Sequence, residues 1–281
     1  MTTRFREGEG SRVPDNRLLL AVDIGNTQTV VGVLEGEDLL ALWRLTSQMG
    51  RTSDELLSLL EPLIRPYVGG LRRGRRVAIA SVVPTQTAAY EEFSTKYLGA
   101  RPVIVDSRLD LGIRIDVPDP SSVGADRIAN AVAVAARYSL PAIVVDLGTA
   151  TTFDVVKRGP RYVGGVIAPG ILTSAEELFR RGARLAKVEL RAPSRAVGRT
   201  TEESLQSGVL FGAAGQIDGI ITRIRSEMAS RPTIVATGGL AGLIAPLCRS
   251  LRIVDPGLTL HGLALIEARV RGRRRGGRKS A

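Results

Sequence analysis

The sequence has almost no cysteine and almost no histidine. Among its 281 residues, Cys248 is the one cysteine and His261 the one histidine. An intramolecular disulfide, a zinc site built from Cys and His, and a Cys-x-x-Cys redox centre are therefore all excluded. A Ser-His-Asp triad would have to use His261, which we expect instead to be a helix-capping or surface residue. This cysteine usage favours a reducing, cytoplasmic setting.

Long apolar runs and familiar phosphate-binding signatures are also missing. No apolar run approaches the roughly 18 residues that a membrane span needs, and residues 1–16 lack the apolar core of a signal peptide. We therefore expect neither a membrane span nor a signal peptide. The sequence contains no Gly-x-x-x-x-Gly-Lys-Ser/Thr, which excludes a P-loop kinase. Hydrophobic residues make up 44% of the chain, enough for one large core or two smaller ones.

The net charge of +11 is concentrated in two short segments. Residues 269–281 hold seven basic side chains and no acid, and residues 72–76 hold four arginines, so the rest of the chain is net neutral. An Arg-rich tail without aromatic residues predicts weak, sequence-independent binding of polyanions rather than base recognition. We expect that deleting the tail leaves catalysis largely unchanged.

Apolar runs and helical patterns alternate along the chain and predict an α/β fold made from a duplicated unit. Each half opens with an apolar strand that ends in Asp-x-Gly, followed by small hydroxyl residues, a hairpin and a third strand. The predicted organisation is a flexible tail at 1–16, a first domain at 17–121, a second domain at 122–270 and a basic tail at 271–281. A capping box at 52–55 predicts a helix that ends near Arg65, before Pro66.

The two Asp-x-Gly strand ends have the chemistry of phosphate-binding turns. They read Asp-Ile-Gly-Asn-Thr-Gln-Thr at 23–29 and Asp-Leu-Gly-Thr-Ala-Thr-Thr at 146–152. Glycine lets the backbone turn closely and present N–H groups, hydroxyls offer further donors, and one aspartate suffices for Mg²⁺ that keeps water and phosphate ligands. Such residues are also ordinary turn formers, but two copies in matching context favour the phosphate-binding interpretation.

A third motif, Val-Gly-Ala-Asp-Arg at 123–127, is predicted to start a helix. Asp126 has the chemistry of a general base for a substrate hydroxyl, and Arg127 offers a donor fork for a carboxylate. An acidic residue in the first turn of a helix is equally typical of simple compensation of the helix dipole. From these residues alone, both interpretations stay open.

The duplicated arrangement resembles the actin-like (ASKHA) ATPase fold, in which two hairpins clasp the nucleotide phosphates from two similar α/β domains. Thr-Gly-Gly at 237–239 resembles the adenosine-side glycine pair of that fold. An ordered set of blocks across about residues 17–268 is, beyond this, similar to type III pantothenate kinases. The blocks are Asp-Ile-Gly-Asn-Thr at 23–27, Ala-Ser-Val-Val-Pro at 80–84, Val-Gly-Ala-Asp-Arg-Ile at 123–128, Asp-Leu-Gly-Thr-Ala-Thr-Thr at 146–152, Gly-Gly-Val-Ile-Ala-Pro-Gly at 164–170, and Gly-Arg-Thr-Thr-Glu at 198–202 with Ser-Gly at 207–208.

The resemblance implies a cytoplasmic homodimer that phosphorylates pantothenate with ATP, the first step of coenzyme A biosynthesis. Its cofactors would be Mg²⁺ and a monovalent cation, K⁺ or NH₄⁺. Asp126 would accept the proton, Asp146 would bind the monovalent cation, and Asp23 would hold Mg²⁺ through water. The implied ATP-binding residues are Asp23, Ile24, Gly25, Asn26, Thr27, Gln28, Thr29, Val30 and Thr149. The implied pantothenate-binding residues are Gly124, Ala125, Asp126, Arg127 and Thr201, the last plausibly from the other subunit.

Two residues depart from the family pattern. Val117 stands where the family often has tyrosine, which would change the shape of the pantothenate pocket, and Thr200 stands where asparagine is usual. Two alternatives remain: an accessory transcriptional regulator that binds nucleic acid on an actin-like scaffold, and a related kinase for another small hydroxyl compound. The Arg-rich tail motivates the first of these.

Overall fold

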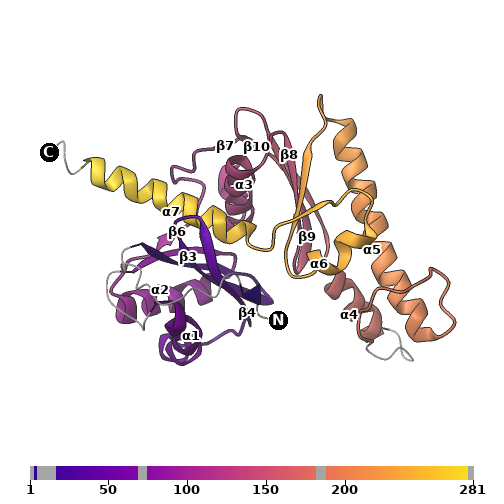
Figure 1. Ribbon diagram of the computed structural model, residues 1–281, viewed down its shortest axis with the longest axis horizontal. Helices are drawn as coiled ribbons and strands as arrows, with labels where there is room; N and C mark the ends of the chain where they lie inside the picture. The colour runs from indigo at the N-terminus through magenta and orange to yellow at the C-terminus, as the bar shows by residue number, and fades with distance from the viewer. Residues whose placement is uncertain (1–2, 5–16, 69–74, 182–187, 278–281) are drawn as a thin grey trace. The chain divides into compact units, whose positions relative to one another are not determined.

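The computed structural model (Figure 1) describes residues 3–4, 17–68, 75–181 and 188–277. The chain forms two compact units, one from residues 1–133 together with 257–281 and one from residues 134–256. Most of the predicted N-terminal tail, residues 278–281 of the predicted basic tail, and Arg72 and Arg73 lie outside the described residues. No helix in the described part of the chain is both long and apolar enough to cross a membrane.

Unit 1 is built on a mixed sheet with the strand order β1-β4-β3-β2-β5-β6. β2, β3 and β4 are successive antiparallel neighbours, whereas β5 runs parallel to β2 and β6 runs parallel to β5. The strands are β1 (Thr3–Arg4), β2 (Leu18–Ile24), β3 (Gln28–Glu35), β4 (Asp38–Thr46), β5 (Arg76–Ser81) and β6 (Val103–Ile104), and a further short strand is β7 (Arg114–Ile115). The helical elements are α1 (Ser53–Val68), α2 (Pro84–Leu98), η1 (Pro120–Ser122), α3 (Ala125–Arg137), which continues into unit 2, and α7 (Leu258–Gly277).

Both faces of the unit 1 sheet are buried because β2 carries apolar residues on both sides. Leu20 and Val22 pack in the cluster that contains the inner faces of α1 and α2. Leu19 and Ala21 point the other way, into the cluster formed with α3 and α7. Figure 1 shows α1 and α2 on one side of this sheet and α7 on the other. The sheet therefore holds the carboxyl ends of β2 and β5 rigidly side by side.

The C-terminal helix α7 is locked into unit 1 by a close backbone approach and a buried charge. A Cβ atom on Gly262 would lie 2.0 Å from the carbonyl oxygen of Ala129, so only glycine fits where α7 crosses α3. Glu267 is 1% exposed and accepts two hydrogen bonds from Arg76, including one from Nε at 2.7 Å. Its other carboxylate oxygen lies 2.9 Å from Nε of Arg271.

Unit 2 repeats the strand plan of unit 1. Its strands lie in the order β12-β11-β8-β9-β10, with β8, β9 and β10 antiparallel and β11 and β12 parallel to β8. They are β8 (Ala142–Leu147), β9 (Ala150–Lys157), β10 (Arg161–Pro169), β11 (Thr233–Thr237) and β12 (Ile253–Val254). The helices are α4 (Ile171–Arg181), α5 (Thr201–Ser226), α6 (Ala241–Ile244) and η2 (Ala245–Leu247). This repetition confirms the predicted α/β fold from a duplicated unit.

The structure differs from the sequence predictions at several points. The division between units falls inside α3 rather than at residue 122, and residues 257–270 belong to unit 1, because α7 packs against β2 and α3. Residues 271–277, predicted as tail, continue α7, and α1 runs past Pro66 to Val68. His261 is buried in α7 rather than at the surface. Arg75 is buried and Arg76 is paired with Glu267, so neither is part of a solvated basic appendage.

Candidate active site

The first Asp-x-Gly motif forms the tight turn between β2 and β3. The N–H of Gly25 donates to the carbonyl oxygen of Gln28 at 3.0 Å, and a Cβ atom on Gly25 would lie 2.8 Å from that oxygen. Glycine is therefore required for the turn to close this tightly. Asn26, Thr27 and Gln28 are exposed on it, and Asp23 and Val30 are half-buried at its base. The turn presents small donors and backbone amides at the end of a buried strand, as the sequence predicts.

Two residues of the predicted phosphate loop point away from the surface. Ile24 is fully buried, and Thr29 is 1% exposed. The hydroxyl of Thr29 is hydrogen-bonded to that of Ser47, 2.8 Å away in the segment that follows β4. In this structure Thr29 therefore supports the turn from the inside. Sequence reasoning did not single out Ser47, because it lies in no motif.

The third motif joins the same edge of unit 1. The N–H of Val82, just after β5, donates to the carbonyl oxygen of Ile24 at 3.1 Å. A Cβ atom on Gly124 would lie 3.6 Å from Cγ1 of Val82 and 2.5 Å from Oδ1 of Asp126. Residues 124–127 thus begin α3 beside the strand ends that carry the first turn.

Asp126 lies at the start of α3 and is half-buried. Its Oδ1 accepts a hydrogen bond from the N–H of Arg127 at 2.8 Å, so the carboxylate folds back over the helix N-terminus. Gly124 leaves room for this arrangement, since a side chain there would collide with the carboxylate. Oδ1 therefore accepts a backbone hydrogen bond at the start of the helix. The arrangement holds a proton acceptor in a fixed place.

The second Asp-x-Gly motif forms the matching turn in unit 2, between β8 and β9. The N–H of Gly148 donates to the carbonyl oxygen of Ala150 at 3.0 Å, and Gly148 and Thr149 are exposed. The carbonyl oxygen of Thr149 accepts a hydrogen bond from the hydroxyl of Thr173 at 2.8 Å. A Cβ atom on Gly170 would lie 2.0 Å from that same oxygen. The start of α4 therefore fixes the conformation of the second turn.

Gly238 follows β11 and packs directly against Asp146. β11 pairs with β8 in a register that places Thr237 opposite Asp146. Gly238 has a φ of 92°, and a Cβ atom on it would lie 2.6 Å from Oδ1 of Asp146 and from the N of Leu147. Gly238, one of the glycine pair predicted to lie near adenosine, thus makes room for the Asp146 carboxylate. Any larger residue at 238 would strain the backbone and displace that carboxylate.

Thr201 is the first residue of α5 and is exposed. The preceding Thr200 is the N-cap, and its hydroxyl accepts from the N–H of Glu203 at 3.1 Å. Threonine and asparagine both cap helices in this way, which explains why Thr200 is compatible with a family pattern that has asparagine. The predicted pantothenate-binding residues lie in different units, with 124–127 in unit 1 and Thr201 in unit 2.

The carboxylates fit a cation that is bound mainly by phosphate and water. Among the described residues, no three His, Cys, Asp or Glu side chains cluster as a metal site. Asp23 and Asp146 instead lie near the ends of β2 and β8, each half-buried beside a turn rich in N–H groups and hydroxyls. Mg²⁺ is commonly held by one or two carboxylates together with substrate phosphates and water. The donor set present in each unit is consistent with that type of binding.

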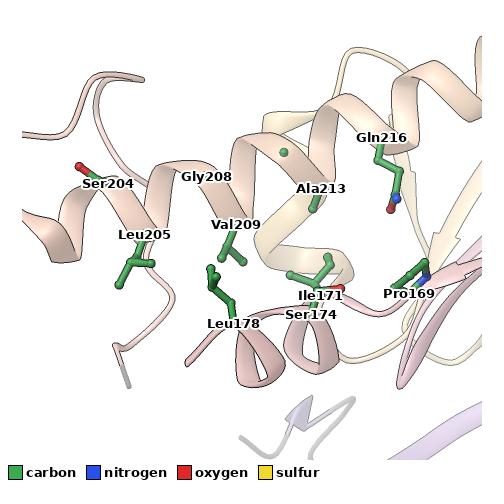
Figure 2. Close-up of a pocket in the computed structure, with 11 residues that line it drawn as sticks. Pro169, Ile171, Ser174, Leu178, Ser204, Leu205, Gly208, Val209, Ala213 and Gln216 are labelled. Carbon is green, nitrogen blue, oxygen red and sulfur yellow. The ribbon is translucent and has the colours of Figure 1, made fainter. Parts of the chain in front are cut away.

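A groove of about 330 Å³ lies between α4 and α5 (Figure 2). Figure 2 shows Leu205 and Val209 of α5 facing Leu178 of α4 across it. Leu178 is 45% exposed, which is high for a leucine on the inner side of a helix pair. Gly208 and Gly212 also line the groove, and a Cβ atom on either would meet nothing within 4 Å. The groove is therefore apolar and open.

The repeated sheets, each with its own Asp-x-Gly turn, have the actin-like fold, and solved structures share it. The AMPPNP-bound MreB 5 of Spiroplasma citri has a TM-score of 0.55 and 11% identity, and covers 94% of this chain and 100% of that chain. A structure from Campylobacter jejuni described as a putative Baf family transcriptional activator has a TM-score of 0.54 and 20% identity, and covers 88% and 96% of the two chains. At these identities the similarity shows the fold alone.

The sequence comparisons go further than the fold. A sequence model of the type III pantothenate kinase family matches residues 19–223, and this chain belongs to that family. The type III pantothenate kinase of Moorella thermoacetica is 45% identical over 252 residues, which cover 90% of this chain and 99% of the relative. That of Thermomicrobium roseum is 48% identical over 246 residues, which cover 88% and 95%. The resemblance found in the six sequence blocks is thereby confirmed.

Proposed function

We propose that this chain transfers the terminal phosphoryl group of ATP to the primary hydroxyl of pantothenate, with Asp126 as the proton acceptor. Membership of the family supports the reaction, and with it the role in coenzyme A biosynthesis. The observation that carries the residue assignment is the position of the Asp126 carboxylate. It is held at the start of α3, beside the strand ends that bear the first phosphate turn.

The proposed reaction is an in-line displacement at phosphorus. Asp126 takes the proton as the hydroxyl oxygen of pantothenate forms its bond to the γ-phosphorus and the bond to the ADP oxygen breaks. Arg127 pairs with the pantothenate carboxylate, because a guanidinium fork suits that planar anion. Gly124 and Ala125 contribute backbone contacts at the helix start, and Thr201 of the partner subunit provides a hydroxyl.

The nucleotide is assigned to the two turns. Residues 23–30 would contact phosphate oxygens mainly through the exposed backbone and side chains of 26–28, and Thr149 would do so in unit 2. Asp23 would hold Mg²⁺ through water, and Asp146 would bind the monovalent cation, K⁺ or NH₄⁺. These cations would offset negative charge on the transferred phosphoryl group, a role that a lysine plays in P-loop kinases.

The reaction itself is tested by measuring ADP release with ATP, Mg²⁺ and K⁺, with and without pantothenate. We expect release to depend on pantothenate and to fall when K⁺ is replaced by a large organic cation. A rate indifferent to pantothenate would contradict the proposal, and turnover of a different small alcohol in its place would favour a related kinase.

We place the reaction in the cytoplasm, in keeping with a chain that has one cysteine, Cys248. This cysteine is buried, and burial raises the pKa of its thiol to about 12.

A homodimer formed through the groove between α4 and α5 is the oligomeric state that we propose. The groove exposes Leu178 on α4 and, at Gly208 and Gly212, helix backbone without side chains on α5. α5 also begins at Thr201, the residue that we expect to reach the partner's site. A second copy of the same helix pair would cover both features.

We expect Leu178→Arg to convert the dimer to a monomer, because it places a charge in the apolar groove. Light scattering coupled to gel filtration gives the mass directly. Val254→Arg is the matched control, since Val254 is 40% exposed but lies on β12, outside the groove. If the Leu178→Arg variant has the mass of a dimer, as the control should, this groove is not the interface.

The regulator interpretation gains no support from the family relationship. The proposed role of the basic tail is limited to weak, salt-sensitive binding of polyanions. Two of its arginines are already engaged within unit 1, Arg271 by Glu267 and Arg273 by Asp110 at 2.8 Å. A gel shift with unrelated DNA sequences should show binding at low salt that disappears at physiological salt.

A further inference from the structure

Behind the first phosphate turn lie two hydroxyl groups that are hydrogen-bonded to each other and come from different segments. The hydroxyl of Ser47 donates to the carbonyl oxygen of Gly25 at 2.7 Å, and its backbone N–H donates to the carbonyl oxygen of Thr27 at 2.9 Å. Ser47 Oγ and Thr29 Oγ1 are 2.8 Å apart. Ser47 follows β4, and Thr29 is the second residue of β3, the strand after the turn.

The available protons fix the direction of these hydrogen bonds. A carbonyl oxygen only accepts, so the single proton of Ser47 is donated to Gly25. Thr29 therefore donates its own proton to Ser47. Both donors point toward the turn, and hydrogen bonds aligned in this way polarise and strengthen one another.

The pair is shielded from water on the side of Thr29. Thr29 is 1% exposed, and Ser47 is half-buried. A buried polar pair that is fully satisfied restricts the groups it binds to one arrangement.

We propose that Ser47 and Thr29 are positioning residues that hold the Gly25 turn in its phosphate-binding conformation. They act through the backbone of Gly25 and Thr27 rather than by touching the nucleotide. This inference rests on the proposed assignment of residues 23–30 to the phosphates of ATP. It predicts an effect on nucleotide binding that is separate from pantothenate binding.

The decisive comparison is between Ser47→Val and Ser47→Thr, which have nearly the same volume and differ only in the hydroxyl. Loss of one hydrogen bond to the turn should raise the KM for ATP about tenfold in Ser47→Val, with the KM for pantothenate changed less than twofold. Ser47→Thr should stay within about twofold of the unmodified protein for both. Ser58→Ala removes another serine hydroxyl bonded to a backbone carbonyl, on the exposed side of α1, and serves as the control. Equal KM values for ATP in the Val and Thr variants would overturn the inference.

Thr29→Val tests whether the two hydroxyls act together. It should raise the KM for ATP less than Ser47→Val does, about threefold, because Thr29 bonds to Ser47 and its hydroxyl does not reach the turn itself. Combined with Ser47→Val it should add nothing further, whereas effects that multiply would overturn the coupling of the two hydroxyls. Direct titration of ATP binding without pantothenate keeps the two proposals apart. Weakened ATP binding in Ser47→Val supports the positioning role even if pantothenate proves not to be the acceptor.

Discussion

Asp126→Asn should bind ATP normally and yet turn over about a hundredfold or more slowly, the scale of losing a general base. The side-chain amide oxygen of asparagine can still accept the hydrogen bond that the N–H of Arg127 gives to Oδ1, so the start of α3 should be preserved. What asparagine lacks is the basicity to take the proton from the pantothenate hydroxyl. Steady-state kinetics for kcat and ATP titration for affinity measure the two effects separately.

The control separates catalysis from helix capping. Asp119 is the N-cap of η1, and its carboxylate accepts from the N–H of Ser121 at 3.0 Å and from the Ser121 hydroxyl at 2.6 Å. Asp119→Asn makes the same chemical change at a capping carboxylate outside the proposed machinery, and it should keep kcat within about twofold. If both variants lose turnover equally, or if Asp126→Asn turns over normally, Asp126 is not the proton acceptor.

Glu267→Gln should lower the free energy of unfolding by about 3 kcal/mol or more, the usual cost of breaking a buried ion pair by neutralising one partner. The carboxylate is 1% exposed and lies between Arg76 and Arg271. Glutamine keeps the shape but leaves the Arg76 guanidinium, which is 16% exposed, without its counter-charge. Urea unfolding followed by circular dichroism gives the value.

The chain contains a matched exposed counterpart. Glu177 on α4 is also paired with two arginines, Arg180 and Arg181, but its side chain is 44% exposed. Glu177→Gln should leave the unfolding curve essentially unchanged, because solvent screens exposed pairs. Overlapping unfolding curves for both variants and the unmodified protein would show that burial does not make the Glu267 pair contribute more to the free energy of unfolding than the exposed pair does. Truncation before Arg271 removes one partner of Glu267. Deletion of the whole basic segment should therefore destabilise the protein more than its composition predicts.

The fold class was predictable because the same strand, Asp-x-Gly and hairpin pattern occurs twice in one chain. The place of the last helix was not. Its apolar periodicity predicts a helix but says nothing of its partner, which is decided by contacts such as Gly262 against Ala129, far apart in the sequence. The pairing of Arg76 with Glu267 depends on the same packing of α7, whereas charge counting alone assigns arginines to the surface.

Candidate site residues could be named from the motifs, but the residues that support them could not. Gly124, Gly170 and Gly238 each leave space for a neighbouring oxygen, which requires knowing what approaches them. Thr29 belongs to a motif that indicates phosphate contact, yet strand alternation turns its hydroxyl inward while Gln28 stays exposed. Ser47 lies outside every motif, and only the fold brings its hydroxyl behind the turn.

The arrangement of the units also sets an order for folding during synthesis. Unit 2 is one continuous stretch of chain, whereas unit 1 needs both residues 1–133 and α7. Leu260, Leu263 and Ile266 complete the core beneath β2, and they are synthesised after the whole of unit 2. The half of the protein that is made first must therefore wait with one face of its sheet uncovered, while the half made later can finish folding before it.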